Sequence, residues 1–255
     1  MRIQFASDLH LEFKENLAYV QSIPFEVTGE ILILAGDTFY LKDRTMPNIK
    51  FWKWASQNYQ QVMLVPGNHE FYNNGDVSVR GDSWQYTFLD NVGYYYNKVV
   101  RIDDVDIVLS TLWSHIPAEN EFNVFRGMND FCQILYDKHR LRIEDFNVEH
   151  EKCLSFIKQS VLESTAKHIV VATHHLPTFQ AVAKERINDS MNNAYVTELG
   201  NFIADSRIDY WIYGHSHKNI DTEIGTTKIV SNQLGYLFNG GQAEGFSASR
   251  FIELQ

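Results

Sequence analysis

The chain has 255 residues, and 44% of them are hydrophobic, which is enough for one large core. Its formal charge is −10, and this acidic balance argues against binding of long duplex nucleic acid, which usually requires a basic face. No apolar run approaches the roughly 20 residues of a membrane span, and the N-terminal run is too short for a signal peptide. These features predict a cytoplasmic protein without a membrane partner.

The two cysteines, Cys132 and Cys153, match no metal-ligand spacing. We expect buried thiols in a reducing compartment rather than a disulfide. No composition shift or flexible linker divides the chain, so we expect a single domain over residues 1–255.

Three short apolar runs open the chain, at residues 2–7, 30–35 and 62–65. None of them alternates with polar residues, which is typical of strands buried on both faces. Two helical patterns lie between them, around residues 17–23 and 51–59. The β-α-β-α-β order favours a sheet that begins with parallel strands.

The rest of the chain predicts a mixed set of elements. A hairpin is expected around Asp103-Asp104. Residues 113–143 have no firm period, so they are interpreted as an irregular insertion, near the polar motifs described below. Helices are expected at 144–164 and 193–204, and strands at 169–172, 210–213, 220–224, 227–231 and 249–253. Parallel units followed by late antiparallel strands indicate two packed sheets with helices outside.

Polar motifs with metal-ligand residue types follow the apolar runs. They are Asp8-Leu9-His10, Gly36-Asp37, Gly67-Asn68-His69-Glu70, Thr173-His174-His175 and Gly214-His215-Ser216-His217. Ligands of open α/β folds bind at the carboxyl ends of strands, and side chains two residues apart on an extended segment point the same way. A carboxylate can also bridge two cations, whereas a neutral imidazole cannot. The ordered set therefore predicts a site for two divalent cations.

Each motif taken alone has a simpler interpretation. Gly36-Asp37 is a common turn sequence, and Asn68-His69 after Pro66-Gly67 fits a turn as well. The metal-site hypothesis depends on all the motifs occurring together, each at the end of an expected strand.

The motifs resemble the pattern of the calcineurin-like metallophosphoesterase superfamily, which reads D-x-H, G-D, G-N-H-[ED], H and G-H-x-H. All five blocks are present between residues 8 and 217. The resemblance implies a four-layer α-β-β-α sandwich, with two mixed sheets packed face to face and helices outside. It also implies a dinuclear metal centre. The mixed nitrogen and oxygen ligands admit manganese, iron and zinc, with manganese favoured.

The resemblance also implies roles for individual residues. One metal would be held by Asp8, His10 and His217, the other by Asn68, His174 and His215, with Asp37 between them. His69 would hydrogen-bond a phosphate oxygen or protonate the leaving group, and His175 would lie behind the ligands.

The chain departs from the protein serine/threonine phosphatase branch of that superfamily. That branch has G-D-x-V-D-R-G, in which the second Asp supports the catalytic histidine, whereas this chain has Gly36-Asp37-Thr38-Phe39-Tyr40. The residue that orients His69 is therefore not carried over, and Glu70 is a candidate.

The function implied is metal-dependent hydrolysis of a small phosphomonoester or nucleotide phosphodiester by a bridging hydroxide. Alternatives are a nuclease acting on short single strands and, less favoured because no ligand is missing, a non-catalytic scaffold. Arg126 and His115 in the insertion are candidate substrate-binding residues, although Arg126 could simply be solvated. Arg186 and Asn188 are further candidates.

Overall fold

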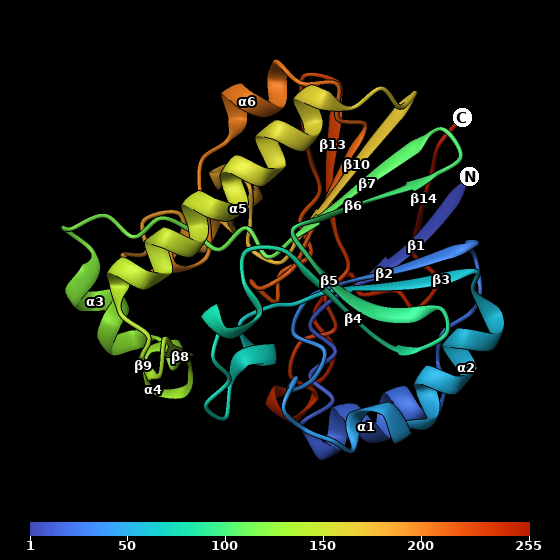
Figure 1. The fold of residues 1–255 in the computed structure, drawn as a ribbon, viewed down its shortest axis with the longest axis horizontal. Helices are drawn as coiled ribbons and strands as arrows, with labels where there is room; N and C mark the ends of the chain where they lie inside the picture. Colours follow the sequence, from blue (N-terminus) through green and yellow to red (C-terminus); the bar gives the residue numbers. More distant parts are fainter.

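The computed structural model describes residues 1–255 and contains two six-stranded sheets packed against each other, with helices on the two outer faces (Figure 1). The strand orders are β14-β1-β2-β3-β5-β4 and β12-β13-β11-β10-β7-β6. The predicted layered sandwich of two mixed sheets is confirmed.

The first sheet is built around four parallel strands, β1 (Arg2–Ala6), β2 (Ile31–Ala35), β3 (Gln61–Val65) and β5 (Val92–Tyr96). Its two edge strands are antiparallel to their neighbours: β14 (Phe251–Glu253) pairs with β1, and β4 (Trp84–Leu89) pairs with β5. Helices α1 (Lys14–Gln21) and α2 (Lys50–Asn58) cover its outer face (Figure 1).

The second sheet repeats this plan. Its parallel strands are β7 (Val105–Ser110), β10 (His168–Thr173), β11 (Tyr210–Tyr213) and β13 (Thr227–Ser231). Its antiparallel edges are β6 (Lys98–Ile102) and β12 (Thr222–Ile224). Helices α5 (Ile143–Glu163) and α6 (Gly200–Ala204) lie outside it.

Burial on both faces explains why central strands such as β2 are apolar throughout. In β2, Ile31 and Ile33 belong to the core between the two sheets, whereas Leu32 and Leu34 belong to the core beneath α1 and α2. Such a central strand therefore has no solvent-facing side on which polar residues would alternate, whereas the edge strand β6 is partly exposed.

Most of the predicted strands are present within one or two residues, and the hairpin around Asp103-Asp104 is confirmed as β6–β7. The prediction of one continuous helix over residues 193–204 is wrong. Only a 3-10 turn (Asn192–Ala194) and α6 are helical, and the backbone of Leu176 pairs with Tyr195 and Thr197 instead. This long-range pairing overrides the local helical pattern, since tertiary context outweighs propensity.

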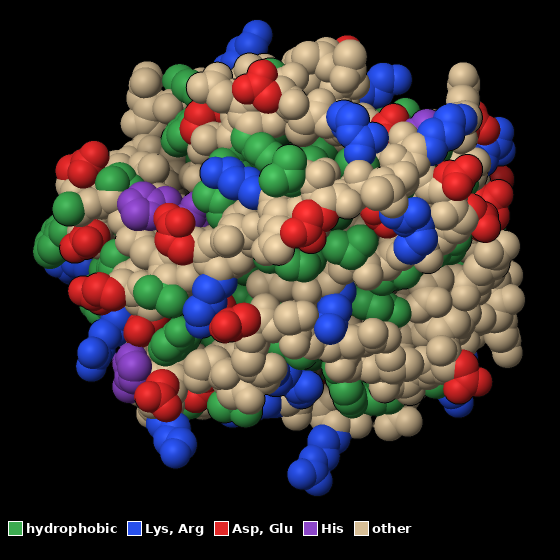
Figure 2. Space-filling view, turned by 45° about the horizontal axis from the view of Figure 1, so that its top comes forward, with side chains coloured by type: hydrophobic (Ala, Val, Ile, Leu, Met, Phe, Trp, Pro, Cys, Tyr) green, Lys and Arg blue, Asp and Glu red, His purple; other side chains and the backbone are tan.

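The segment 113–143 contains α3 (Glu121–Gly127), α4 (Asp130–Gln133) and a small hairpin of β8 (Leu135–Tyr136) and β9 (His139–Arg140). The remaining 3-10 turns are Met46–Asn48, His69–Phe71, Ser78–Arg80, Phe179–Ala181, Lys184–Arg186 and Leu237–Asn239. No helix combines the length and the apolar character that crossing a bilayer requires. On the face shown in Figure 2, acidic and basic side chains are interspersed, without a continuous basic stripe.

The two thiols differ in their surroundings. Cys153 lies buried on α5, where burial raises the pKa of its thiol to about 11. Cys132 is exposed, so the expectation of a buried thiol is wrong for that residue.

Because the thiolate is the reactive form, we predict that a disulfide reagent labels one thiol of the native protein rapidly and two after unfolding. Rapid labelling of both thiols in the native protein would contradict this packing.

Candidate metal centre

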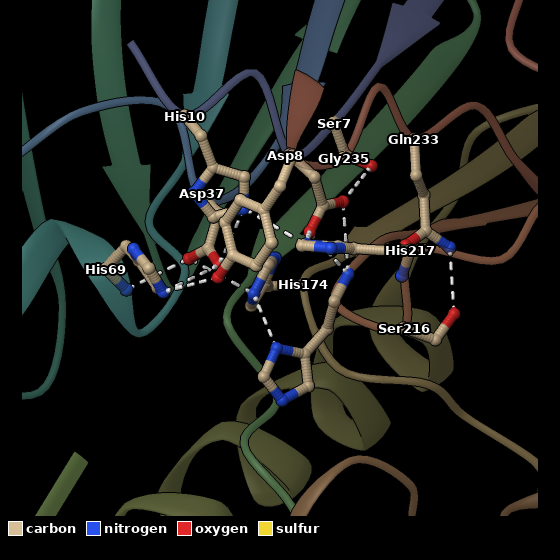
Figure 3. A network of polar contacts seen from close by, with 12 residues as sticks. Ser7, Asp8, His10, Asp37, His69, His174, Ser216, His217, Gln233 and Gly235 are labelled. Carbon is tan, nitrogen blue, oxygen red and sulfur yellow. Dashed lines mark hydrogen bonds and ion pairs between the residues drawn. The ribbon is translucent and has the colours of Figure 1, made fainter. Parts of the chain in front are cut away.

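The polar motifs meet where the two sheets present the carboxyl ends of their parallel strands (Figure 3). Strands β1, β2 and β3 of the first sheet lead into Asp8, Asp37 and Asn68, and strands β10 and β11 of the second lead into His174 and His215. These five residues are buried. The fold therefore brings together side chains from both sheets in a cluster from which most of the solvent is excluded.

One group of donor atoms is formed by Asp8, His10 and His217. The Nε2 atoms of the two histidines lie 3.0 Å apart, and Nε2 of His217 lies 3.2 Å from Oδ1 of Asp8. The backbone N–H of His217 donates to Oε1 of Gln233, and this hydrogen bond holds the loop after β11 that carries His217.

A second group is formed around His174. Its Nε2 lies 3.1 Å from Oδ1 of Asn68, 3.1 Å from Nδ1 of His215 and 3.2 Å from Oδ1 of Asp37. The opposite nitrogen, Nδ1, donates to the backbone carbonyl of Ala35 at 2.9 Å. This hydrogen bond leaves Nε2 of His174 as the atom directed into the group.

Asp37 lies between the two groups. Its Oδ1 faces His174, and its Oδ2 lies 3.7 Å from Nε2 of His10 and 3.9 Å from Nε2 of His69. Burial opposes ionisation of Asp37, but the neighbouring His174 and His69 outweigh it and hold the pKa of the carboxyl well below its usual value. One carboxylate thus presents a different oxygen to each group of histidines.

The donor atoms fit divalent cations. The Nε2 atoms of His10 and His217 face each other, so two unprotonated rings would repel unless a proton or a cation lay between them. Imidazole nitrogens together with carboxylate and amide oxygens form a donor set suited to manganese, iron and zinc. The residues present are therefore able to bind divalent metal.

The glycines of two motifs are required by close contacts. A Cβ at Gly36 would lie 2.2 Å from Nδ1 of His174, and one at Gly67 would lie 2.2 Å from Oδ1 of Asp37. Several of the polar residues also have positive φ angles, a strained conformation typical of functional sites; these are Asp8, His10, Asp37, His215 and His217, with φ between 46° and 74°.

Glu70 does not contact the ring of His69. Its carboxylate instead accepts hydrogen bonds from the backbone N–H groups of Asp37 at 2.9 Å, Thr38 at 2.6 Å and Gly67 at 2.6 Å. Burial, followed by the charge of Asp37, raises its pKa to about 7. Glu70 therefore ties the loops after β2 and β3 together, and the expectation that it orients His69 is wrong.

His175 lies behind the second group, as its ring is 5.4 Å from that of His174 and 4.3 Å from that of His215. It is fully buried, and neither ring nitrogen has a hydrogen-bond partner. Burial holds its pKa well below the usual value, so the ring is neutral.

The sequence interpretation missed Glu12, which contacts both His10 and His69. Its Oε1 lies 3.0 Å from Nδ1 of His10 and 2.7 Å from Nδ1 of His69. The spacing of Asp8, His10 and Glu12 was a usable signal, because polar residues alternate with Leu9 and Leu11 as they would on an extended segment with one polar side.

Two further polar residues were missed because they are distant in sequence. Asp130 on α4 accepts hydrogen bonds from Nδ2 of Asn68 at 2.8 Å and from the hydroxyl of Tyr72 at 2.7 Å, which turns Oδ1 of Asn68 toward His174. The hydroxyl of Tyr236 lies 3.3 Å from Nε2 of His69. No local pattern marks either residue, since both depend on tertiary packing.

A cavity of about 670 Å³ opens over the cluster. Asp37 is the only acidic residue among those that line it, and Arg186 and Lys218 are the basic ones. Arg126 and His115 do not line the cavity: the guanidinium of Arg126 lies over the ring of Phe122 at 5.5 Å, and the ring of His115 packs near that of His150 at 6.1 Å. Asn188 is also absent from the lining.

The family model for calcineurin-like phosphoesterases matches residues 1–219, which include every one of these motifs. The chain therefore belongs to the calcineurin-like phosphoesterase family. It is a metallophosphoesterase, a hydrolase of a family that uses divalent metals, and its histidine and aspartate clusters are able to bind them.

The individual relatives have low sequence identity to this chain. An uncharacterized protein of Acanthamoeba polyphaga mimivirus is 28% identical over 263 residues, which cover 92% of this chain and 92% of that protein. The phosphopantetheinyl hydrolase of Mycobacterium tuberculosis has a TM-score of 0.67 at 16% identity, covering 98% of this chain and 95% of that one. The protein TT1561 of Thermus thermophilus has a TM-score of 0.53 at 12% identity, covering 94% and 91%. These two structures share the fold.

We predict that Gly36→Ala disrupts the centre, because the added Cβ would meet the ring of His174. Overpacking of this kind costs about 1–3 kcal/mol, so both the melting temperature and the bound metal, measured by elemental analysis, should fall. Gly81→Ala is the matched control, since Gly81 also has a positive φ but nothing lies within 4 Å of its Cβ position. Equal losses in the two variants would show that backbone strain alone is responsible.

Proposed function

We propose that this chain hydrolyses a small phosphoester at a dinuclear metal centre. Asp8, His10 and His217 would hold one cation, Asn68, His174 and His215 the other, and Asp37 would bridge them. The observation that carries the proposal is the position of Asp37, whose two oxygens face two separate groups of imidazoles. A carboxylate in this arrangement can serve two cations at once.

Divalent cations in such a site lower the pKa of a coordinated water to about 7 and neutralise charge on the phosphoryl oxygens. The side chains of the protein supply the proton donor and hold it in position. A protonated His69 would donate its Nδ1–H to Glu12 and keep its Nε2–H, which is on the side of Asp37 and Tyr236, for the leaving-group oxygen. The stacked ring of Tyr72, with its centroid 4.1 Å away, restricts movement of the His69 ring.

The cavity supports a small substrate. Its volume of about 670 Å³ lies in the range typical of small-molecule sites. Phe13, Tyr236 and Phe238 are in mutual ring contact along its lining, and Phe238 is 49% exposed. These rings would suit a phosphomonoester with an apolar group or a nucleotide phosphodiester.

A nuclease acting on short single strands is the second candidate, because exposed aromatic rings can stack on bases. The cavity lining offers only two basic residues to follow a polynucleotide backbone, Arg186 and Lys218. We therefore favour a small phosphoester. Manganese is the proposed metal, although iron and zinc accept the same donor atoms.

The test compares the manganese, iron and zinc forms on an aryl phosphomonoester, an aryl phosphodiester and a short single-stranded DNA. A phosphopantetheinyl ester belongs in the panel because one structural neighbour is a phosphopantetheinyl hydrolase. We expect turnover of a small ester with two metal ions per chain by elemental analysis, and His69→Ala should lower kcat by about 100-fold or more.

Absence of turnover with every ester and metal would overturn the proposal. A single bound ion in the fully active enzyme would overturn the dinuclear assignment alone. Preferential cleavage of the DNA would favour the nuclease.

The substrate-binding arginine can be tested separately. Arg186 lines the cavity, whereas Arg126 lies outside the lining. Because a hydrogen bond to a charged group contributes about 1.5–3 kcal/mol, Arg186→Ala should raise KM at least about 10-fold with little change in kcat. Lys184→Ala, in the same 3-10 turn, is the control. A rise in KM for Arg126→Ala instead would restore the role expected from the sequence.

A further inference from the structure

Glu12 connects the metal centre to the proton donor. One atom of its carboxylate, Oε1, accepts hydrogen bonds from Nδ1 of His10 and from Nδ1 of His69, and its side chain is only 2% exposed. We propose that Glu12 is a positioning residue that orients both rings together. This inference rests on the proposed function, because it assigns His10 to the metal and His69 to the leaving group.

The hydrogen bonds decide which nitrogen of each ring faces the site. A carboxylate can only accept, so Nδ1 of both rings must carry a proton. In His10, this leaves the unprotonated Nε2 directed toward Nε2 of His217 at 3.0 Å and Oδ2 of Asp37 at 3.7 Å. A ring flip of His10 would turn a carbon atom toward the metal ligands and would break the bond to Glu12. Glu12 therefore selects the tautomer that can bind a cation, as supporting carboxylates do in many metal sites.

The same oxygen also fixes the distance between the two rings. The centroids of His10 and His69 lie 4.5 Å apart in an edge-to-face arrangement, with the planes at 73°. Since both rings donate to one atom, neither can shift without lengthening its own bond or displacing Glu12. The proton donor is thereby held at a fixed position relative to the ring that binds the cation.

Glu12 is the side chain that accepts a hydrogen bond from Nδ1 of His69. Asp37 approaches the ring from the Nε2 side at 3.9 Å, and the hydroxyl of Tyr236 also lies at Nε2. The carboxylate of Glu70 is engaged with backbone N–H groups. The second oxygen of Glu12, Oε2, is buried and has no partner, so the two imidazoles are the only hydrogen-bond donors to this buried carboxylate.

Glu12→Ala removes the shared acceptor, and Glu12→Gln keeps an acceptor oxygen without the negative charge. The matched control is Glu15→Gln three residues later, because the Glu15 side chain is 42% exposed and its ion pair is with Lys14. Folding of each variant is checked by circular dichroism and melting temperature. If Glu12→Ala does not fold, Glu12→Gln provides the test.

Three measurements follow. Histidine ¹⁵N spectra of the metal-free wild type should show Nδ1–H on both His10 and His69. Glu12→Ala should weaken binding of manganese, measured by calorimetry, by about 10- to 100-fold. At saturating manganese, the loss of kcat should grow as the leaving group of an aryl phosphate becomes more basic, because only poor leaving groups need a positioned acid. Glu12→Gln should show a smaller loss, and Glu15→Gln none.

The inference is overturned if the wild-type spectra place the proton of either ring on Nε2 alone. It is also overturned if saturating manganese restores full kcat to Glu12→Ala, or if the loss of kcat is the same for all leaving groups, as a purely structural role predicts. If the wild type turns over no ester, the proposed function fails, whereas the orientation of His10 is still decided by the spectra and by manganese affinity.

Discussion

The structure depends on the burial of Asp37 among imidazoles from both sheets. A buried carboxylate without partners is costly, and here the pKa of Asp37 stays well below its usual value because His174 and His69 compensate for burial. Much of the surrounding geometry serves this arrangement. Gly36 and Gly67 have no side chain where the His174 ring and the Asp37 carboxylate lie, and several of the clustered polar residues have strained backbones. A strained, polar cluster of this kind is stable only because the surrounding layers hold it in place.

Three further buried carboxylates surround the cluster, and each has a different type of partner. Glu70 accepts from backbone N–H groups and joins the loops after β2 and β3. Glu12 accepts from two imidazoles, and Asp130 accepts from the Asn68 amide and the Tyr72 hydroxyl. A buried polar network of this kind fixes side-chain orientation because each broken hydrogen bond leaves an unsatisfied group. The clustered donor side chains are therefore held in defined orientations.

The segment 113–143 contributes residues to the site although it contains none of the sequence motifs. Its helix α4 carries Asp130, and residues 127–129 line the cavity. The segment lacks a single periodic pattern because it is divided among two short helices, a small hairpin and the turns between them. Its substrate-binding candidates were misplaced: Arg126 lies over Phe122, and Arg186, from the 3-10 turn 184–186, reaches the cavity instead.

The sequence by itself determined the layers and the motifs. Buried strands such as β2 are apolar on both faces, and Asp8, Asp37 and His215 stand directly after strands, so strand ends and donor residues could be located from local patterns. Only the tertiary structure decided the partners of those donors. The role of Glu12 depends on two rings 2 and 57 residues away meeting at one oxygen, and the helix expected at 193–204 gave way to pairing of Leu176 with Tyr195 and Thr197. Periodicity records which face of an element is buried, but it contains no information about which distant side chain will lie against that face.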